Sequence, residues 1–242
     1  MVSVFIKEVN LFLNSLIAYI VIGVFLTGIG LLTWVFPDTN VLDYGYASLE
    51  TLFNLGPYVL MFLIPAITMR MFAEEQKTGT IELLLTRPLT DWDIIIGKFL
   101  ASWLLVAFSI LPTLIYYVSI YQLGNPVGNL DTPGIIGSYI GLILLGGLFA
   151  SIGIFSSSLT DNQIISFILA VFFCFLFFEG FNSIAAIDVW GTFSLLIEQV
   201  GIIYHYNSLS KGLLDFKDLV YFLSVIVLFL VFTFTVIESR KW

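Results

Sequence analysis

Six long apolar stretches divide the chain, and shorter polar segments separate them. A membrane-spanning helix needs about 20 predominantly apolar residues, because in lipid every backbone amide must bond within its own helix. No acidic residue, lysine or histidine lies in the middle of a stretch. The pattern predicts an all-α integral membrane protein with six transmembrane helices. These are expected over residues 16–36, 55–72, 97–121, 135–157, 164–178 and 219–237.

The fifth stretch, residues 164–178, is the shortest and consists almost entirely of Phe, Ile and Leu. Its length is marginal for a full crossing. Two interpretations are open. The helix continues through Gly180, or the segment ends in a bent hairpin.

Residues 2–14 show apolar positions at helical spacing, with polar residues on the other side. The apolar members are Val2, Phe5, Ile6, Val9, Phe12 and Leu13, and the polar ones are Lys7, Glu8, Asn10 and Asn14. This pattern favours a helix that lies in the membrane interface. The alternative is that the segment extends the first span inward.

The composition agrees with this pattern. Hydrophobic residues make up 59% of the 242 positions and charged residues 11%, whereas soluble globular proteins carry about 25% charge. A water-soluble domain of this size could not bury so much apolar surface. The composition therefore excludes a soluble globular protein.

Basic residues predict the orientation, because they are retained on the cytoplasmic side of spans. With six spans, one side holds Lys7, Arg70, Lys77, Arg87, Lys98, Arg240 and Lys241, and the other holds Lys211 and Lys217. Both termini are thus expected in the cytoplasm. Most of the net charge of −8 falls on the outer loops, which argues against nucleic acid as a partner.

Residues 70–98 form a charged segment between two apolar ones and carry nine of the 26 charged residues. Thr78 and Thr80 are predicted N-caps of a short helix over residues 81–85 that ends at Pro88. So short a helix needs a partner surface for its apolar side. An ordinary loop whose leucines rest on the bilayer is the alternative. Thr90 is expected, with Asp91, to cap the third span.

Motifs for nucleotide chemistry are missing from the sequence. Gly97-Lys98 lacks the upstream glycine and the following hydroxyl of a phosphate-binding loop. We therefore expect ATP and magnesium to bind to a partner subunit. This chain is expected to bind no cofactor and to contain no catalytic residue. Cys174 is expected to serve only packing among phenylalanines. His205 has no second ligand at metal-binding spacing. Glu179 is expected at a helix terminus facing lipid headgroups.

Glycine and proline add local expectations. Gly137-x-x-x-Gly141 and Gly147-x-x-x-Ser151 would let another helix approach the fourth span closely, either in a dimer or within the chain. Pro65 and Pro112 interrupt the second and third spans and favour kinks there.

The charged segment carries a family resemblance. Glu75-Gln-Lys-Thr-Gly79-Thr80-Ile-Glu82-Leu83-Leu84-Leu85-Thr-Arg87-Pro88, followed by Ile95-Ile96-Gly97-Lys98-Phe99, resembles the signature between the second and third spans of ABC-2 type permeases. The pattern His205-x-x-Ser208-x-x-x-Gly212-Leu-Leu-Asp215-x-x-Asp218-Leu-Val-Tyr221-Phe222 is similar to one at the start of the sixth span in that family.

This resemblance implies that the cytoplasmic segment 73–90 holds a coupling helix that docks into a separate ATPase subunit. It assigns docking to Glu75, Gly79, Thr80, Glu82, Leu83, Leu84, Arg87 and Pro88. Glu82 is the expected key polar contact.

A narrower resemblance is to the gliding-motility permease subunits of Bacteroidetes, the GldF type. It rests on Tyr121-Gln-Leu-Gly124-Asn-Pro126-Val-Gly128-Asn-Leu-Asp131 and on Ser158-Leu-Thr-Asp161-Asn162-Gln163. It implies an N-terminal elbow helix, a dimeric permease, a GldA-like ATPase and a larger GldG-like partner in the inner membrane. The alternatives are an exporter of polysaccharide, lipid or drug, and a non-transporting mechanical or assembly subunit.

Residues 181–218 are too apolar for a solvated outer loop. Trp190, Phe193, Ile197, Val200 and Tyr204 would lie near one side of a possible helix. The apolar surface is broadened by Leu195, Leu196, Ile202 and Ile203. Because ABC-2 permeases have re-entrant helices between spans five and six, we expect a re-entrant outer gate formed by Trp190, Phe193, Ile197 and Tyr204.

Overall fold

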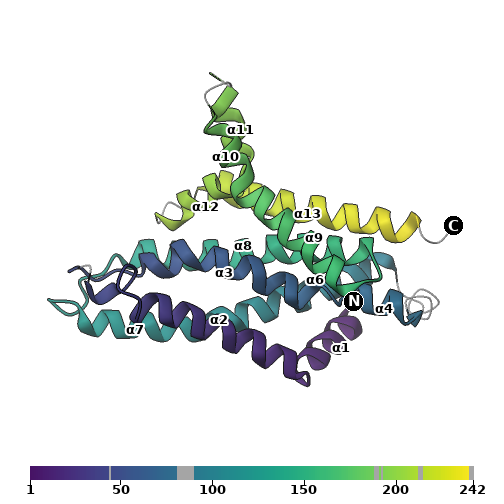
Figure 1. The fold of residues 1–242 in the computed structure, drawn as a ribbon, viewed down its shortest axis with the longest axis horizontal. Coiled ribbons are helices and arrows are strands. Elements are labelled where there is room, and N and C mark those ends of the chain that lie inside the picture. Colours follow the sequence, from purple (N-terminus) through teal and green to yellow (C-terminus); the bar gives the residue numbers. More distant parts are fainter. Residues whose placement is uncertain (44, 81–89, 188–190, 192, 212–214, 240–242) are drawn as a thin grey trace.

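Every regular element in the described part of the chain is helical (Figure 1). The computed structural model describes residues 1–242 apart from 44, 81–89, 188–190, 192, 212–214 and 240–242. The long helices are α2 (Leu16–Trp34), α3 (Glu50–Thr68), α6 (Asp91–Ile110), α8 (Thr132–Leu159), α9 (Gln163–Phe175) and α13 (Phe216–Ser239). The shorter helices are α1 (Val2–Leu13), α4 (Ala73–Lys77), α7 (Leu114–Leu123), α10 (Phe181–Ala185), α11 (Ser194–Val200) and α12 (Ile202–Ser210).

Among the described residues, five continuous helical segments are long and apolar enough to cross a membrane. They are Glu50–Lys77, Asp91–Leu123, Thr132–Leu159, Gln163–Ala185 and Phe216–Ser239. These match five predicted spans and make the chain a multi-pass membrane protein. The first predicted span corresponds to α2. This helix is long and apolar enough to cross a membrane only when α1 is counted with it, and the two helices are bent by 68° to each other.

At Pro112, where the sequence favours a kink, the helix changes its geometry. A single 3-10 turn, Leu111–Thr113, separates α6 from α7, because proline cannot donate the helical backbone hydrogen bond. Pro65 has a different outcome, since α3 continues through it to Thr68.

The fifth span continues beyond Gly180, as one of the two interpretations proposed. A π-helical turn, Leu176–Gly180, joins α9 to α10 without a break. Cys174 is fully buried in the hydrophobic core. Glu179 accepts a hydrogen bond from the Tyr58 hydroxyl at 3.4 Å.

Helix α8 lies at the centre of the bundle, with 72% of its span buried, against 22% for the span that contains α9. Its glycines pack inside the chain. A Cβ on Gly141 would lie 3.2 Å from Leu209, and one on Gly147 would lie 2.9 Å from Trp103. At these two positions the small residues therefore serve internal packing.

The bundle has two distinct ends (Figure 1). Helices α1 and α4 and the last turns of α13 lie toward one end, and the start of α8 lies at the other. Helices α10 and α11 protrude from the bundle, and α12 returns to pack on α8. Helix α4 and the helices α10, α11 and α12 thus lie in separate regions of the bundle. We call residues 181–210, which contain these three helices, the outer hairpin.

Candidate functional site

We call residues 73–90, which are predicted to bind an ATPase subunit, the docking segment. It begins with α4, at the end of the second spanning segment. Of the residues assigned to it, Glu75, Gly79 and Thr80 are described. Glu82, Leu83, Leu84, Arg87 and Pro88 lie outside the described residues. The described part of the site consists of the helices on either side of these residues, α4 and α6, and the side chains that contact them.

Gly79 ends α4. Its φ of +70° lies in the left-handed region, and its N–H donates to the carbonyl of Gln76 at 3.2 Å. Glycine is favoured at such helix C-termini because it has no Cβ. The prediction that Thr78 is an N-cap is wrong. Thr78 is the C-cap of α4, and its hydroxyl donates to the carbonyl of Glu74 at 2.8 Å.

Thr80 follows this turn and is exposed. Its hydroxyl lies 2.9 Å from the hydroxyl of Thr78. Ten residues later, Thr90 is the N-cap of α6, as predicted. It forms a capping box with Asp93, whose backbone N–H donates to the Thr90 hydroxyl at 3.2 Å. The docking segment thus contains a defined C-terminal turn of α4 and ends at a defined N-cap of α6.

Lys98 is the most deeply buried charge of the region, with 1% of its surface exposed. Its Nζ donates to Glu8 Oε1 at 2.8 Å and to the carbonyl of Met71 at 2.7 Å. It also lies 2.9 Å from Glu75 Oε2, in an ion pair without hydrogen-bond geometry. Two carboxylates and a carbonyl therefore compensate the buried ammonium of Lys98.

The same carboxylates meet a second lysine at the surface. Lys7 is 47% exposed and donates to Glu75 Oε1 at 2.9 Å. Glu8 was expected on the polar side of α1, yet only 4% of it is exposed. Two lysines and two glutamates thus form a neutral cluster that joins α1, α4 and α6. We call Lys7, Glu8, Glu75 and Lys98 the ion cluster.

The end of α8 forms hydrogen bonds with the turn between α3 and α4. The Ser157 hydroxyl accepts from the N–H groups of Phe72 and Ala73 at 2.9 and 3.1 Å and donates to the carbonyl of Met69 at 3.0 Å. Gln76 Nε2 donates to the carbonyl of Ser158 at 3.0 Å. The start of α4 is therefore fixed to the central helix.

Sequence reasoning missed Glu8, Lys98 and Ser157 as parts of this site. For Glu8 the helical pattern gave no signal, because it placed this residue on the polar side of α1. The serines at 156–158 offered none, because only the three-dimensional arrangement shows which hydroxyl meets α4.

The predicted outer gate is divided between two helices. The backbone of Gly201 is extended, with ψ of 141°, and separates the short helices α11 and α12. Phe193 and Tyr204 are 64% and 40% exposed, and Ile197 is half-buried. Trp190 lies outside the described residues.

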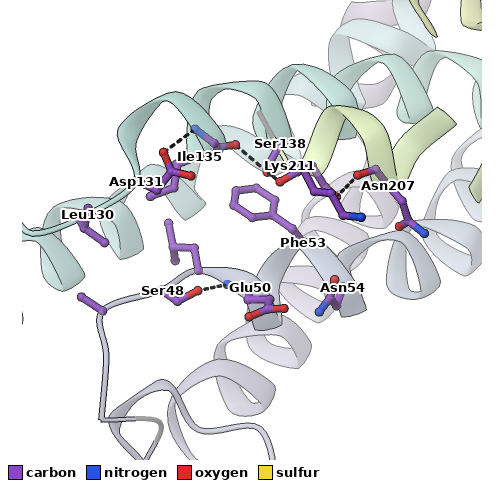
Figure 2. Close-up of a pocket in the computed structure, with 14 residues that line it drawn as sticks. Ser48, Glu50, Phe53, Asn54, Leu130, Asp131, Ile135, Ser138, Asn207 and Lys211 are labelled. Atoms are coloured by element: carbon purple, nitrogen blue, oxygen red, sulfur yellow. Dashed lines mark hydrogen bonds between the residues drawn. The ribbon is translucent and has the colours of Figure 1, made fainter. Parts of the chain in front are cut away.

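A polar pocket of 310 Å³ opens where α3, α8 and α12 meet (Figure 2). Glu50, Asp131 and Lys211 line it with charges of both signs. Asp131 accepts from the N–H of Gly134 at 3.2 Å, and Ser138 donates to the carbonyl of Ser210 at 2.9 Å. The pocket can admit water and small polar groups. Among the described residues, no group of three His, Cys, Asp or Glu side chains could hold a metal ion.

A comparison with protein families gives one match. The model described as "ABC-2 family transporter protein" matches residues 36–242. This range contains the ends of the docking segment, Lys98, Ser157 and the outer hairpin. None of the curated proteins searched matches the chain.

Proposed function

The chain belongs to the family of ABC-2 transporter proteins, and from this premise we propose that it is a permease subunit driven by a separate ABC ATPase. ATP and magnesium would bind to that ATPase. In this proposal, ATP binding moves the docking segment, and the segment moves the membrane helices.

The ion cluster is the observation that carries the proposal. Lys98 on α6 contacts Glu75 on α4 and Glu8 on α1, so the helix that begins the docking segment and the helix that follows it share one buried charge. Separating them would leave charges unpaired in a site of low exposure, which costs several kcal/mol. A force on the segment is therefore expected to move α1, α4 and α6 together.

The proposed roles of the docking residues follow from this arrangement. Leu83 and Leu84 supply the apolar contact to the ATPase, and Glu82 the principal polar contact, with Thr80, Arg87 and Pro88 shaping the segment. Gly79 terminates α4 within it. Glu75 is engaged by both lysines of the cluster, so we assign it an anchoring role in place of direct docking.

Charge reversal at one position tests the proposal. Glu82→Lys should leave the permease folded in the membrane and abolish co-purification of an ATPase in mild detergent. The matched control is Glu238→Lys, an exposed carboxylate at the end of α13, which should retain the ATPase. Normal recovery of the ATPase with Glu82→Lys, or no ATPase with the wild type, would contradict the assignment.

We further propose that the chain lies in the bacterial inner membrane with both termini in the cytoplasm. The excess of basic residues on the α1, α4 and α13 side supports this orientation. Single cysteines in a Cys174→Ser background test it. A cysteine at Lys77 should resist an impermeant thiol reagent in intact cells, and one at Lys211 should react.

The resemblance of residues 121–131 and 158–163 to GldF-type subunits supports a role in gliding motility, with a GldA-like ATPase and a GldG-like partner. Deletion of the gene should abolish surface spreading, and the wild-type chain should restore it. Normal spreading of the deletion strain would favour an exporter of polysaccharide, lipid or drug.

For the outer hairpin we propose a re-entrant gate. The exposed apolar side chains of α11 and the protrusion of α10 and α11 in Figure 1 support contact with lipid or a second subunit. Single cysteines at Phe193, Ile197 and Tyr204 should label poorly with an aqueous reagent. Strong labelling at all three would contradict a membrane-embedded gate.

A further inference from the structure

His205 lies between two hydrogen-bond acceptors. Its Nδ1 is 2.7 Å from Asp218 Oδ1 on α13, and its Nε2 is 2.9 Å from the carbonyl oxygen of Gln199 on α11. A carbonyl oxygen can only accept, and so can an ionised carboxylate. A neutral imidazole has a single N–H and can donate to only one of them.

We infer that His205 and Asp218 form a proton-binding site that clamps the outer hairpin to α13. The two contacts require one proton more than a neutral imidazole and a carboxylate hold together. This is true whether the proton is on the imidazole or on the carboxyl group, because either arrangement places one hydrogen between Nδ1 and Oδ1.

Burial makes this proton necessary. Asp218 is 5% exposed, and its Oδ2 is buried with no hydrogen-bond partner. Without the proton, the neutral imidazole has one N–H for two acceptors. If Nε2 keeps it, the buried carboxylate faces the lone pair of Nδ1 at 2.7 Å, which is costly, and if Nδ1 keeps it, the lone pair of Nε2 faces the carbonyl of Gln199 at 2.9 Å. One of the two contacts is therefore expected to open when the proton leaves.

The groups around His205 support a clamp between helices. From α13, the Tyr221 ring stacks on the imidazole at 3.9 Å, and its hydroxyl donates to the carbonyl of Val200 at 2.5 Å. From α11, only the backbone carbonyls of Gln199 and Val200 take part in these bonds. On its own helix, the Tyr204 ring lies at 5.3 Å. Within the described part of the chain, Asp218 is the one charged group in ion-pair distance of His205.

The rest of α12 stays attached independently of this proton. The Tyr206 hydroxyl donates to the carbonyl of Phe53 at 2.7 Å, and burial raises the pKa of this phenol, so it remains a donor. The clamp therefore controls α11 and the start of α12. The sign follows from linkage: the clamped form binds one more proton, so lower pH favours it and higher pH releases it.

This site also gives a physical reason for a sequence pattern. His205, Asp218 and Tyr221 all belong to the motif before the sixth span, and the structure brings all three together. Histidine ordinarily changes charge between about pH 5 and 8. The hairpin would thus respond to the pH of the compartment it faces.

The chain contains a single histidine, so NMR of ¹⁵N-histidine-labelled protein in lipid nanodiscs reports on His205 alone. Spectra are compared at a lower and a higher pH. At the lower pH, Nε2 should carry a proton and Nδ1 should be protonated or should accept a hydrogen bond from a protonated Asp218, and this signature should be lost at the higher pH. Spin labels attached to cysteines at Leu196 on α11 and Val227 on α13, both exposed, in a Cys174→Ser background measure the distance between the hairpin and α13. Their distance distribution should broaden and shift at the higher pH.

Two variants separate the clamp from a general loss of structure. In Asp218→Asn the amide can donate to a neutral Nδ1, so the hairpin should stay clamped at both pH values. In His205→Phe the stacked ring remains without its hydrogen bonds, so the hairpin should be loose at both. Asp215→Asn, at an exposed carboxylate whose Oδ1 accepts from the N–H of Lys217, should respond as the wild type does.

A wild type whose imidazole is neutral and whose Nδ1 accepts no hydrogen bond in the clamped form would overturn the inference. A distance between the two spin labels that does not change with pH would also overturn it. So would an Asp218→Asn variant in which this distance changes with pH as much as in the wild type. No nucleotide or ATPase is present in these measurements. Their failure would leave the permease assignment intact, and the loss of that assignment would leave the proton site intact.

Discussion

Lys98 and Glu8 are 90 positions apart in the sequence, and the Nζ of the lysine lies 2.8 Å from Oε1 of the glutamate. Lys98 opens the third span, and Glu8 lies on the N-terminal helix α1. Their contact therefore joins α1 to the end of the docking segment. With Glu75 on α4, the pair makes the ion cluster the common attachment of three helices.

Replacing Lys98 by methionine tests this attachment. Lys98→Met keeps most of the side-chain volume and leaves Lys7 as the one cation of the cluster for both Glu8 and Glu75, so that one buried carboxylate is uncompensated. Breaking a buried ion pair from one side costs about 3–5 kcal/mol. The free energy of unfolding should fall by that amount, seen as a lower thermal unfolding temperature in detergent.

The control for this variant is Lys77→Met, at an exposed lysine on α4, which should change stability little. Adding Glu8→Gln to Lys98→Met should recover part of the loss, because one uncompensated carboxylate is removed. Equal stability of Lys98→Met and Lys77→Met would show that the ion cluster does not hold the helices together.

Ser157→Ala is expected to loosen α4 from α8. The change leaves the N–H groups of Phe72 and Ala73 without their acceptor, and each buried orphan donor costs about 1–3 kcal/mol. Hydrogen exchange at residues 72 and 73 should accelerate along with the loss of stability.

Its neighbour Ser156 provides the comparison. Ser156 is equally buried, but its hydroxyl bonds only to the carbonyl of Ile152 in its own helix. Ser156→Ala should therefore keep slow exchange at residues 72 and 73. Similar exchange in both variants would mean that the Ser157 bonds do not hold the turn.

The sequence alone predicts the spans well, since five long apolar stretches correspond to five spanning helices. It also predicts Thr90 as a cap, because capping depends on residues only three positions apart. Local patterns of this kind are visible in the chain itself. The helix break at Gly201 was missed because an apolar pattern at helical spacing continues on both sides of it.

Long-range pairing could not be predicted in this way. A lysine at the start of a span is typically a boundary residue, and nothing near Lys98 in the sequence indicates that Glu8 will neutralise it. His205 and Asp218 belong to one motif, yet only the fold shows that both nitrogens of the ring meet acceptors. Residues of the candidate sites are thus predictable as a set, and their roles depend on packing.

Gly153→Ala should separate α3 from α8. A Cβ on Gly153 would lie 2.0 Å from the Thr68 hydroxyl oxygen and 2.8 Å from its Cβ, so no rotation of the threonine removes the clash. Overpacking of this kind costs about 1–3 kcal/mol. The thermal unfolding temperature should fall accordingly.

Gly28→Ala on α2 is the matched substitution, because a Cβ there meets nothing within 4 Å. Alanine also has the higher helix propensity, by about 1 kcal/mol, so this variant should be neutral or more stable. A Gly153→Ala protein as stable as Gly28→Ala would contradict the close approach of α3 and α8.

Helix α9 presents a stripe of exposed apolar side chains, at which we expect the dimeric permease implied by the family resemblance to form. Ile164, Ile168, Phe172 and Phe175 follow one face at intervals of three or four residues and are 50–69% exposed. The test must distinguish such a contact from exposure to lipid. With Ile168→Cys in a Cys174→Ser background, mild oxidation of membranes should produce a disulfide-linked homodimer.

A cysteine at Ile115 on α7, which is 65% exposed, is the control and should stay monomeric, because lipid is expected around it. Co-expression of two differently tagged copies identifies the partner, since both tags must appear in the cross-linked band. A band that contains one tag and another membrane protein would indicate a heteromeric permease. Equal cross-linking from Ile115 and Ile168 would mean random collision and would remove α9 as the subunit contact.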